Sequence, residues 1–123
     1  MPTFTRHERL KSKKLIERLF ERGQSIDAPP LRMVWMPAIA FCMPAQVSFS
    51  VARRSFRQAV ERNRIKRLMR EAWRLRKQEL YSFLSEKKTS LAVMLIFTGK
   101  KKPRFHEVQE KLVTIIQQLT RSV

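Results

Sequence analysis

The side chains best suited to chemistry in this sequence are the cations between residues 53 and 77. This stretch contains eleven Lys or Arg residues and two Glu residues, in a chain with a formal net charge of +17. Guanidinium and ammonium groups donate charge-assisted hydrogen bonds to carboxylates and phosphates. Because closely spaced like charges repel one another, a polyanion that binds them relieves an unfavourable interaction. The chemistry indicated is phosphate binding.

The sequence offers no comparable arrangement for catalysis or for metal binding by the protein. His7 and His106 lie far apart, and Cys42 is the only cysteine, so no set of ligands has the spacing of a zinc site. No Ser or Cys nucleophile can be paired with a base and an orienting acid, and the two glycines form no phosphate-binding loop. We predict no catalytic residue, no metal site and no cofactor bound by the protein alone.

Length and composition favour one basic domain over residues 1–123. The chain has 123 residues, 43% of them hydrophobic, and a pI near 11.4. There is no apolar run of membrane-spanning length and no secretory signal, and the lone cysteine fits a reducing compartment. We expect an anionic partner and a cytoplasmic location. A membrane surface is a weaker candidate, because the basic segment has no exposed apolar face to enter lipid.

A long helix is expected to position the cations, because the segment from residue 62 onward divides into two stripes on a helical wheel. The apolar stripe consists of Ile65, Leu68, Ala72 and Leu75, with Met69 at its edge. The opposite stripe consists of Asn63, Lys66, Arg67, Arg70, Arg74 and Lys77. A merely solvated face normally mixes both signs of charge, and this stripe carries no acid. We therefore predict that it contacts nucleic acid.

The remaining elements follow from hydrophobic periodicity and breaker residues. They are a helix between Ser12 and Gly23, strands at 24–28, 31–36 and 46–51, the basic helix, a strand at 91–97, and a helix from Phe105 to Leu119. Pro37 is expected to end the second strand, and residues 38–44 to form a loop. Ser55 and Gln58 fit a capping box that starts the basic helix, which fades between residues 77 and 83. The order α-β-β-β-α-β-α predicts an α+β sandwich with 91–97 as a central strand.

Several aromatic residues have two possible roles. Phe20, Trp35 and Phe49 could stack on bases beside the basic stripe, or each could belong to the core. Trp73 falls at the border between the apolar and basic stripes and could do either. The sequence alone leaves these alternatives open.

The run from Ala59 to Arg74, which contains Arg62-Asn63-Arg64, resembles the signature of the protein subunit of bacterial ribonuclease P. Phe20-x-x-Gly23 is similar to the end of that family's first helix, and Val47-x-x-Ser50-Val51 followed by two arginines to its strand and basic turn. The resemblance covers nearly the whole chain. It implies a mixed sheet with a left-handed β-α-β crossover around the basic helix.

The same resemblance implies a function and a set of site residues. The RNA subunit hydrolyses precursor tRNA to give the mature 5′ end, with Mg²⁺ expected in the RNA-bearing holoenzyme, and the protein binds that RNA and the 5′ leader. The implied RNA-binding residues are Arg53, Arg54, Arg62, Asn63, Arg64, Lys66, Arg67, Arg70 and Arg74. The implied leader cleft consists of Ile16, Phe20, Asn63, Lys66 and Arg70.

Two other classes share the charge and the size of this chain. A structural ribosomal protein would need no leader cleft. A DNA-binding protein would lay the basic helix in a major groove, but such readers usually place a few base-reading side chains on a short helix. Here the positive charge repeats over four turns, so no DNA partner is expected. Restoration of precursor-tRNA cleavage by a ribonuclease P RNA distinguishes the leading hypothesis from both.

Overall fold

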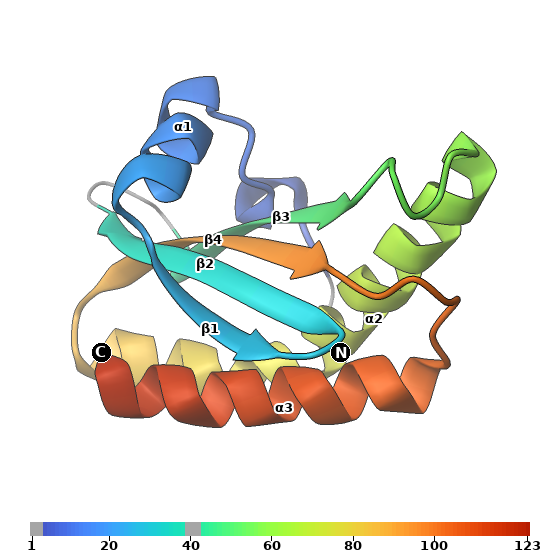
Figure 1. Cartoon of the computed structure of the whole chain (residues 1–123). Coiled ribbons are helices and arrows are strands. Elements are labelled where there is room, and N and C mark those ends of the chain that lie inside the picture. The colour runs from blue at the N-terminus through green and yellow to red at the C-terminus, as the bar shows by residue number, and fades with distance from the viewer. Residues whose placement is uncertain (1–3, 39–42) are drawn as a thin grey trace.

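The computed structural model describes residues 4–38 and 43–123 (Figure 1). Its elements are the 3-10 helix η1 (Arg6–Glu8), α1 (Lys13–Arg22), β1 (Gln24–Ala28), β2 (Leu31–Ala38), β3 (Ala45–Val51), α2 (Ala59–Glu86), β4 (Ser90–Phe97) and α3 (Phe105–Ser122). The predicted order of helices and strands is confirmed, and η1 is an addition. Most of the loop expected at 38–44 lies outside the described residues.

The four strands form one mixed sheet in the order β1-β2-β4-β3. β2 is antiparallel to β1 and to β4, whereas β3 is parallel to β4 and is joined to it through α2. The central position predicted for residues 91–97 is confirmed, since residues 91 to 95 are all buried. The left-handed sense of the β3-α2-β4 crossover stays a prediction.

Helices cover both faces of the sheet, which gives two hydrophobic clusters. The larger cluster joins one face of the sheet to α2 and α3, through residues such as Met33, Leu95 and Leu112. The smaller cluster joins the other face to α1, through Leu19 and Met94 among others. Figure 1 shows α1 on the side of the sheet opposite α3. Each helix therefore buries an apolar stripe and leaves its polar side free for binding.

The buried face of α2 differs from the predicted one. Leu68 is only half-buried and Leu75 is 42% exposed, whereas Met69 and Trp73 are completely buried. The helix packs on both β3 and α3, and turning Met69 and Trp73 inward removes more apolar surface from water than turning Leu75 inward. Lys77, which was placed on the exposed cationic stripe, is buried as well. The burial predicted for Ile65 and Ala72 is confirmed, and the positions predicted for Leu68, Leu75 and Lys77 are wrong.

Three element boundaries also differ from the sequence prediction. β2 continues through Pro37, because β1 pairs with it only as far as Trp35 and the missing N–H of the proline leaves no bond to β1 unmade. α2 starts at Ala59 rather than near Ser55, and it continues to Glu86. Ser55 lies in a tight turn instead, where its N–H donates to the carbonyl of Ala52.

α1 ends before Gly23 as predicted, for a reason of space. The backbone φ of Gly23 is −69°, so the left-handed conformation of many helix-ending glycines is not used here. A Cβ at this position would lie 2.4 Å from the carbonyl oxygen of Leu19 and 2.6 Å from Cγ1 of Val34. Glycine is required because β2 passes close to the end of the helix.

Candidate nucleic-acid interface

The exposed part of the predicted RNA-binding set lies on the turn before α2 and on its first turns. The exposed members are Arg53, Arg54, Asn63, Arg64 and Arg67. The two arginines of the turn follow the end of β3, so the strand and the helix together present one basic surface. α2 extends beyond the sheet at this end, as Figure 1 shows, which leaves its first turns accessible.

Two other predicted members have partners within the protein. Nη1 of Arg62 donates to the backbone carbonyls of Phe56 and Arg57, at 2.8 and 2.7 Å. This guanidinium therefore fixes the turn in front of α2, where Gln58 supplies no side-chain cap. Arg74 forms an ion pair with Glu71 one helical turn earlier. Both arginines keep their charge near the basic surface, but part of their hydrogen-bonding capacity is used internally.

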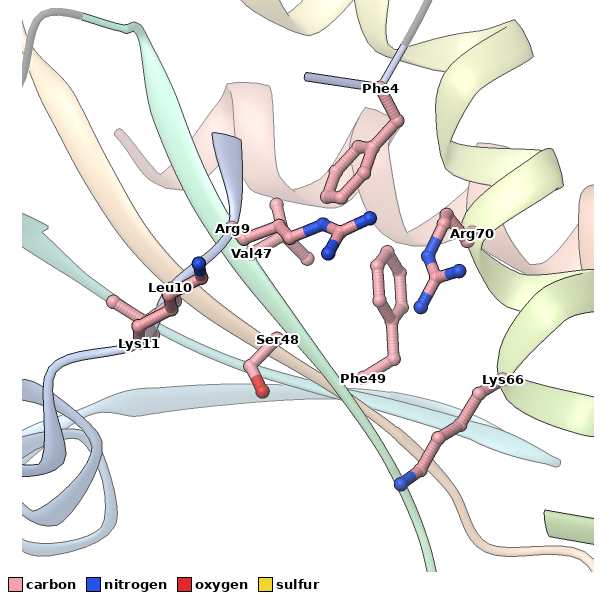
Figure 2. Close-up of a pocket in the computed structure, with 9 residues that line it drawn as sticks. All are labelled: Phe4, Arg9, Leu10, Lys11, Val47, Ser48, Phe49, Lys66 and Arg70. Atoms are coloured by element: carbon pink, nitrogen blue, oxygen red, sulfur yellow. The ribbon is translucent and has the colours of Figure 1, made fainter. Parts of the chain in front are cut away.

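Lys66 and Arg70, four residues apart on α2, line a groove at the edge of the sheet (Figure 2). The other residues that line it are Phe4, Arg9, Leu10, Lys11, Val47, Ser48 and Phe49. The groove has a volume of about 220 Å³, and its lining contains four Lys or Arg side chains and no acid. Figure 2 shows the guanidinium group of Arg9 between the rings of Phe4 and Phe49, and that of Arg70 on the α2 side of Phe49.

Arg70, one of the residues that line this groove, has an unusual environment. Its Nε atom is buried and, among the residues that the structure describes, has no hydrogen-bond partner. A buried donor without a partner costs about 1–3 kcal/mol. An anion that settled against this guanidinium would offset part of that cost.

The structure separates the two groups of residues assigned to the leader cleft. Lys66 and Arg70 line the groove, and Asn63 is exposed one turn earlier on the same helix. Ile16 and Phe20 lie on α1 and do not line it. Ile16 packs against the smaller hydrophobic cluster, whereas Phe20 is 63% exposed and borders a separate hollow.

The structure shows which of the aromatic residues with two possible roles are buried in the core and which are accessible. Trp35 and Trp73 are buried in the larger cluster and are therefore core residues. Phe49 is half-buried, packs beside Phe4 with ring centroids 5.7 Å apart, and lines the groove. Phe20 has the exposed ring that stacking on a base requires.

A buried polar network near the groove was missed in the sequence. Both carboxylate oxygens of Glu8 accept from Nζ of Lys77, at 2.8 and 2.7 Å, and Oε2 also accepts from the hydroxyl of Tyr81 at 2.6 Å. The N–H of Thr5 donates to Oε1 at 3.0 Å. The spacing Thr5-x-x-Glu8 is a capping-box pattern, but nothing local indicates a partner 69 residues away.

The two acidic groups of this network have shifted pKa values. Burial opposes ionisation of Glu8, but the hydrogen bonds from Lys77, Thr5 and Tyr81 outweigh burial and hold the pKa of this carboxyl below its usual value. Burial, together with the hydrogen bond to Glu8, raises the pKa of the Tyr81 hydroxyl. At neutral pH, Glu8 is therefore a carboxylate and Tyr81 a neutral phenol.

The described ranges, 4–38 and 43–123, contain neither a candidate metal site nor a candidate membrane span. No three His, Cys, Asp or Glu side chains are grouped so that they could hold a metal ion. No helix there has the length and hydropathy needed to cross a membrane.

Comparison with known proteins identifies what the chain is similar to. Residues 4–120 match the family model described as Ribonuclease P. A ribonuclease P protein component of Porphyromonas gingivalis is 33% identical over 117 residues, which span 90% of this chain and 83% of that protein. A ribonuclease P protein component of Chlorobium phaeobacteroides is 30% identical over 128 residues, which span 95% and 88%.

Solved structures show the same fold. The RNase P protein of Staphylococcus aureus superposes with a TM-score of 0.73 at 18% identity, covering 91% of this chain and 94% of that one. The RNase P protein of Thermotoga maritima superposes with a TM-score of 0.71 at 21% identity, covering 90% and 96%.

Proposed function

The chain belongs to the ribonuclease P protein family, and we propose that its basic α2 surface binds both the catalytic RNA and the 5′ leader of precursor tRNA. As the protein component of ribonuclease P, it is a subunit of the endoribonuclease that matures the 5′ end of tRNA. The observation that supports the proposal best is the run of cations from Arg53 to Arg70, most of which are exposed or line the groove.

The proposed division of labour follows from the chemistry of the side chains. Hydrolysis is proposed to belong to the RNA subunit, with Mg²⁺ held by the RNA, as membership of the ribonuclease P protein family implies. The protein supplies fixed positive charge, which lowers the repulsion between two RNA molecules and releases their counterions. Its residues bind and orient the RNA, and none of them is proposed to react.

The proposed RNA-binding function also suggests where the protein is located in the cell and what the other predicted RNA-binding residues do. We infer a cytoplasmic location from the role in tRNA maturation together with the basic composition. Arg53, Arg54, Asn63, Arg64 and Arg67 are proposed to contact RNA directly because they are exposed. Arg62 and Arg74 are proposed to contribute through the surface that they shape and through their charge.

Leader recognition by Lys66 and Arg70 is tested by alanine substitution. Each substitution should weaken holoenzyme binding of precursor tRNA roughly ten- to hundredfold, because a charge-assisted hydrogen bond contributes about 1.5–3 kcal/mol. Binding of mature tRNA should change much less. Affinities for both ligands, measured at one salt concentration with melting curves of each variant, give the comparison.

Arg121→Ala is the control for this experiment, because Arg121 is exposed on α3 and contributes nothing to the groove. It should leave both affinities unchanged. Equal losses for precursor and mature tRNA would place Lys66 and Arg70 on the catalytic RNA and would remove the leader assignment.

A further inference from the structure

The chain preceding α1 is held across the free edge of the sheet. β3 is an edge strand, and Arg9 forms a parallel β-bridge with Val47 in its middle. The N–H of Leu10 donates to the carbonyl of Val47 at 3.0 Å, and Nε2 of Gln46 donates to the carbonyl of His7 at 3.1 Å. These contacts give the groove a second wall, opposite the wall that α2 provides.

The second wall brings two cations that the α2 motif does not include. Arg9 and Lys11 are both exposed, and both line the groove with Lys66 and Arg70. They lie more than fifty residues away in sequence, so only the fold brings the four charges together. A site with cations on two opposite walls can contact one anionic strand from both sides.

The acid next to Arg9 is removed from the groove by the buried network. Glu8 would weaken any anion site if its carboxylate pointed outward, but it is 1% exposed and bound to Lys77 and Tyr81. The ion pair does two things at once. It neutralises the only carboxylate in the segment from residue 4 to residue 11, and it anchors that segment to α2.

The size and the lining of the groove indicate which kind of anionic ligand it can bind. Its volume of about 220 Å³ lies below the roughly 300–1,000 Å³ of typical small-molecule pockets, so it encloses no large metabolite. Phe49 and Phe4 supply apolar lining, and Arg70, with its unpartnered Nε, belongs to the wall that α2 provides. Phosphate groups separated by sugars suit a short, open groove with cations along both walls.

We propose that this groove binds the phosphodiester backbone of a single RNA strand, with Arg9 and Lys11 as phosphate-binding residues on the wall that the buried Glu8–Lys77 pair positions. The proposal rests on the proposed function and extends its RNA-binding surface from α2 to the amino-terminal segment. The strand comes from the leader of precursor tRNA or from the catalytic RNA, which share this chemistry.

The test compares Arg9→Ala/Lys11→Ala with a charge-matched variant, Lys111→Ala/Arg121→Ala, whose exposed residues lie on α3 away from the groove. Three affinities are measured over a range of salt: protein for a bacterial ribonuclease P RNA, holoenzyme for precursor tRNA with a leader, and holoenzyme for mature tRNA. The groove variant should lose roughly tenfold in affinity. Its salt slope, d log K/d log[salt], should become less negative by about 1.4, which corresponds to the loss of two single-strand phosphate contacts.

The pattern of loss identifies the source of the strand. A loss confined to precursor tRNA assigns the groove to the leader, and a loss for the catalytic RNA assigns it to that molecule; both support the proposal. Arg9→Lys/Lys11→Arg should restore the salt slope, which a purely structural defect would not allow. If the groove variant matches the α3 variant in all three affinities and slopes, the inference is wrong while the proposed function stands. If the wild-type protein binds none of the three RNAs, both fail.

Discussion

Lys77→Ala should lower the free energy of unfolding by about 3–5 kcal/mol, the largest loss that we expect from removal of a charged side chain in this protein. Lys77 is 5% exposed and its ammonium group bonds both oxygens of Glu8. Removing it leaves a carboxylate buried without its counter-charge, and burial of a lone charge costs several kcal/mol. Urea denaturation at neutral pH measures the loss.

Arg76→Ala is the matched control, because Arg76 is the preceding residue of α2, carries the same charge and is exposed. It should change stability by no more than about 0.5 kcal/mol. If both variants unfold at the same urea concentration, the buried pair does not hold the amino-terminal segment as we describe. Glu8→Ala should resemble Lys77→Ala, because it leaves the ammonium group unpaired in the same place.

Acid should weaken the same network. The pKa of Glu8 lies below its unfolded value, so the carboxylate stabilises the fold fully above the ordinary pKa of a glutamate. This contribution is lost as the pH falls through the lowered pKa. The difference in stability between the wild type and Lys77→Ala should therefore shrink in acid, and a constant difference would contradict the assignment.

Met69→Ala should cost about 2–5 kcal/mol, and Leu68→Ala only about 1 kcal/mol. Met69 is completely buried in the larger hydrophobic cluster, whereas Leu68 is half-buried on the flank of the helix. The two residues are neighbours with similar volumes, so helix propensity affects them almost equally. Thermal melts of the two variants distinguish the orientation of α2 in the structure, with Met69 inward, from the predicted orientation, with Leu68 inward. A larger loss for Leu68→Ala would restore the orientation that the helical wheel predicts.

Local patterns in the sequence were enough to find the elements of this fold. The alternation from Val47 to Val51 and the apolar run from Leu91 to Phe97 each predicted a strand at the correct place. The boundaries that failed depend on neighbours in space. Pro37 is tolerated in β2 because β1 has already ended, and Ser55 turns before α2 begins, which sequence periodicity does not reveal.

The candidate site also contains residues that local spacing predicts and residues whose positions depend on contacts made in the folded chain. Lys66 and Arg70 share a helix face, so their spacing placed them together, and they line one groove. Lys77 follows the same spacing but is buried, since its partner Glu8 comes from the far end of the sequence. Arg9 and Lys11 carry no local signal of binding. Their position depends on a β-bridge to Val47, a contact that only the folded chain makes.

Reconstitution of cleavage tests the central claim, that this chain is the protein component of ribonuclease P and acts through its basic surface. The purified protein is added to a bacterial ribonuclease P RNA with precursor tRNA, at a Mg²⁺ concentration at which the RNA alone cleaves slowly. We predict that the protein restores formation of the mature 5′ end, and that Lys66→Ala/Arg70→Ala restores it poorly while remaining folded. No gain in cleavage over the RNA alone, or full restoration by the double variant, would contradict the account.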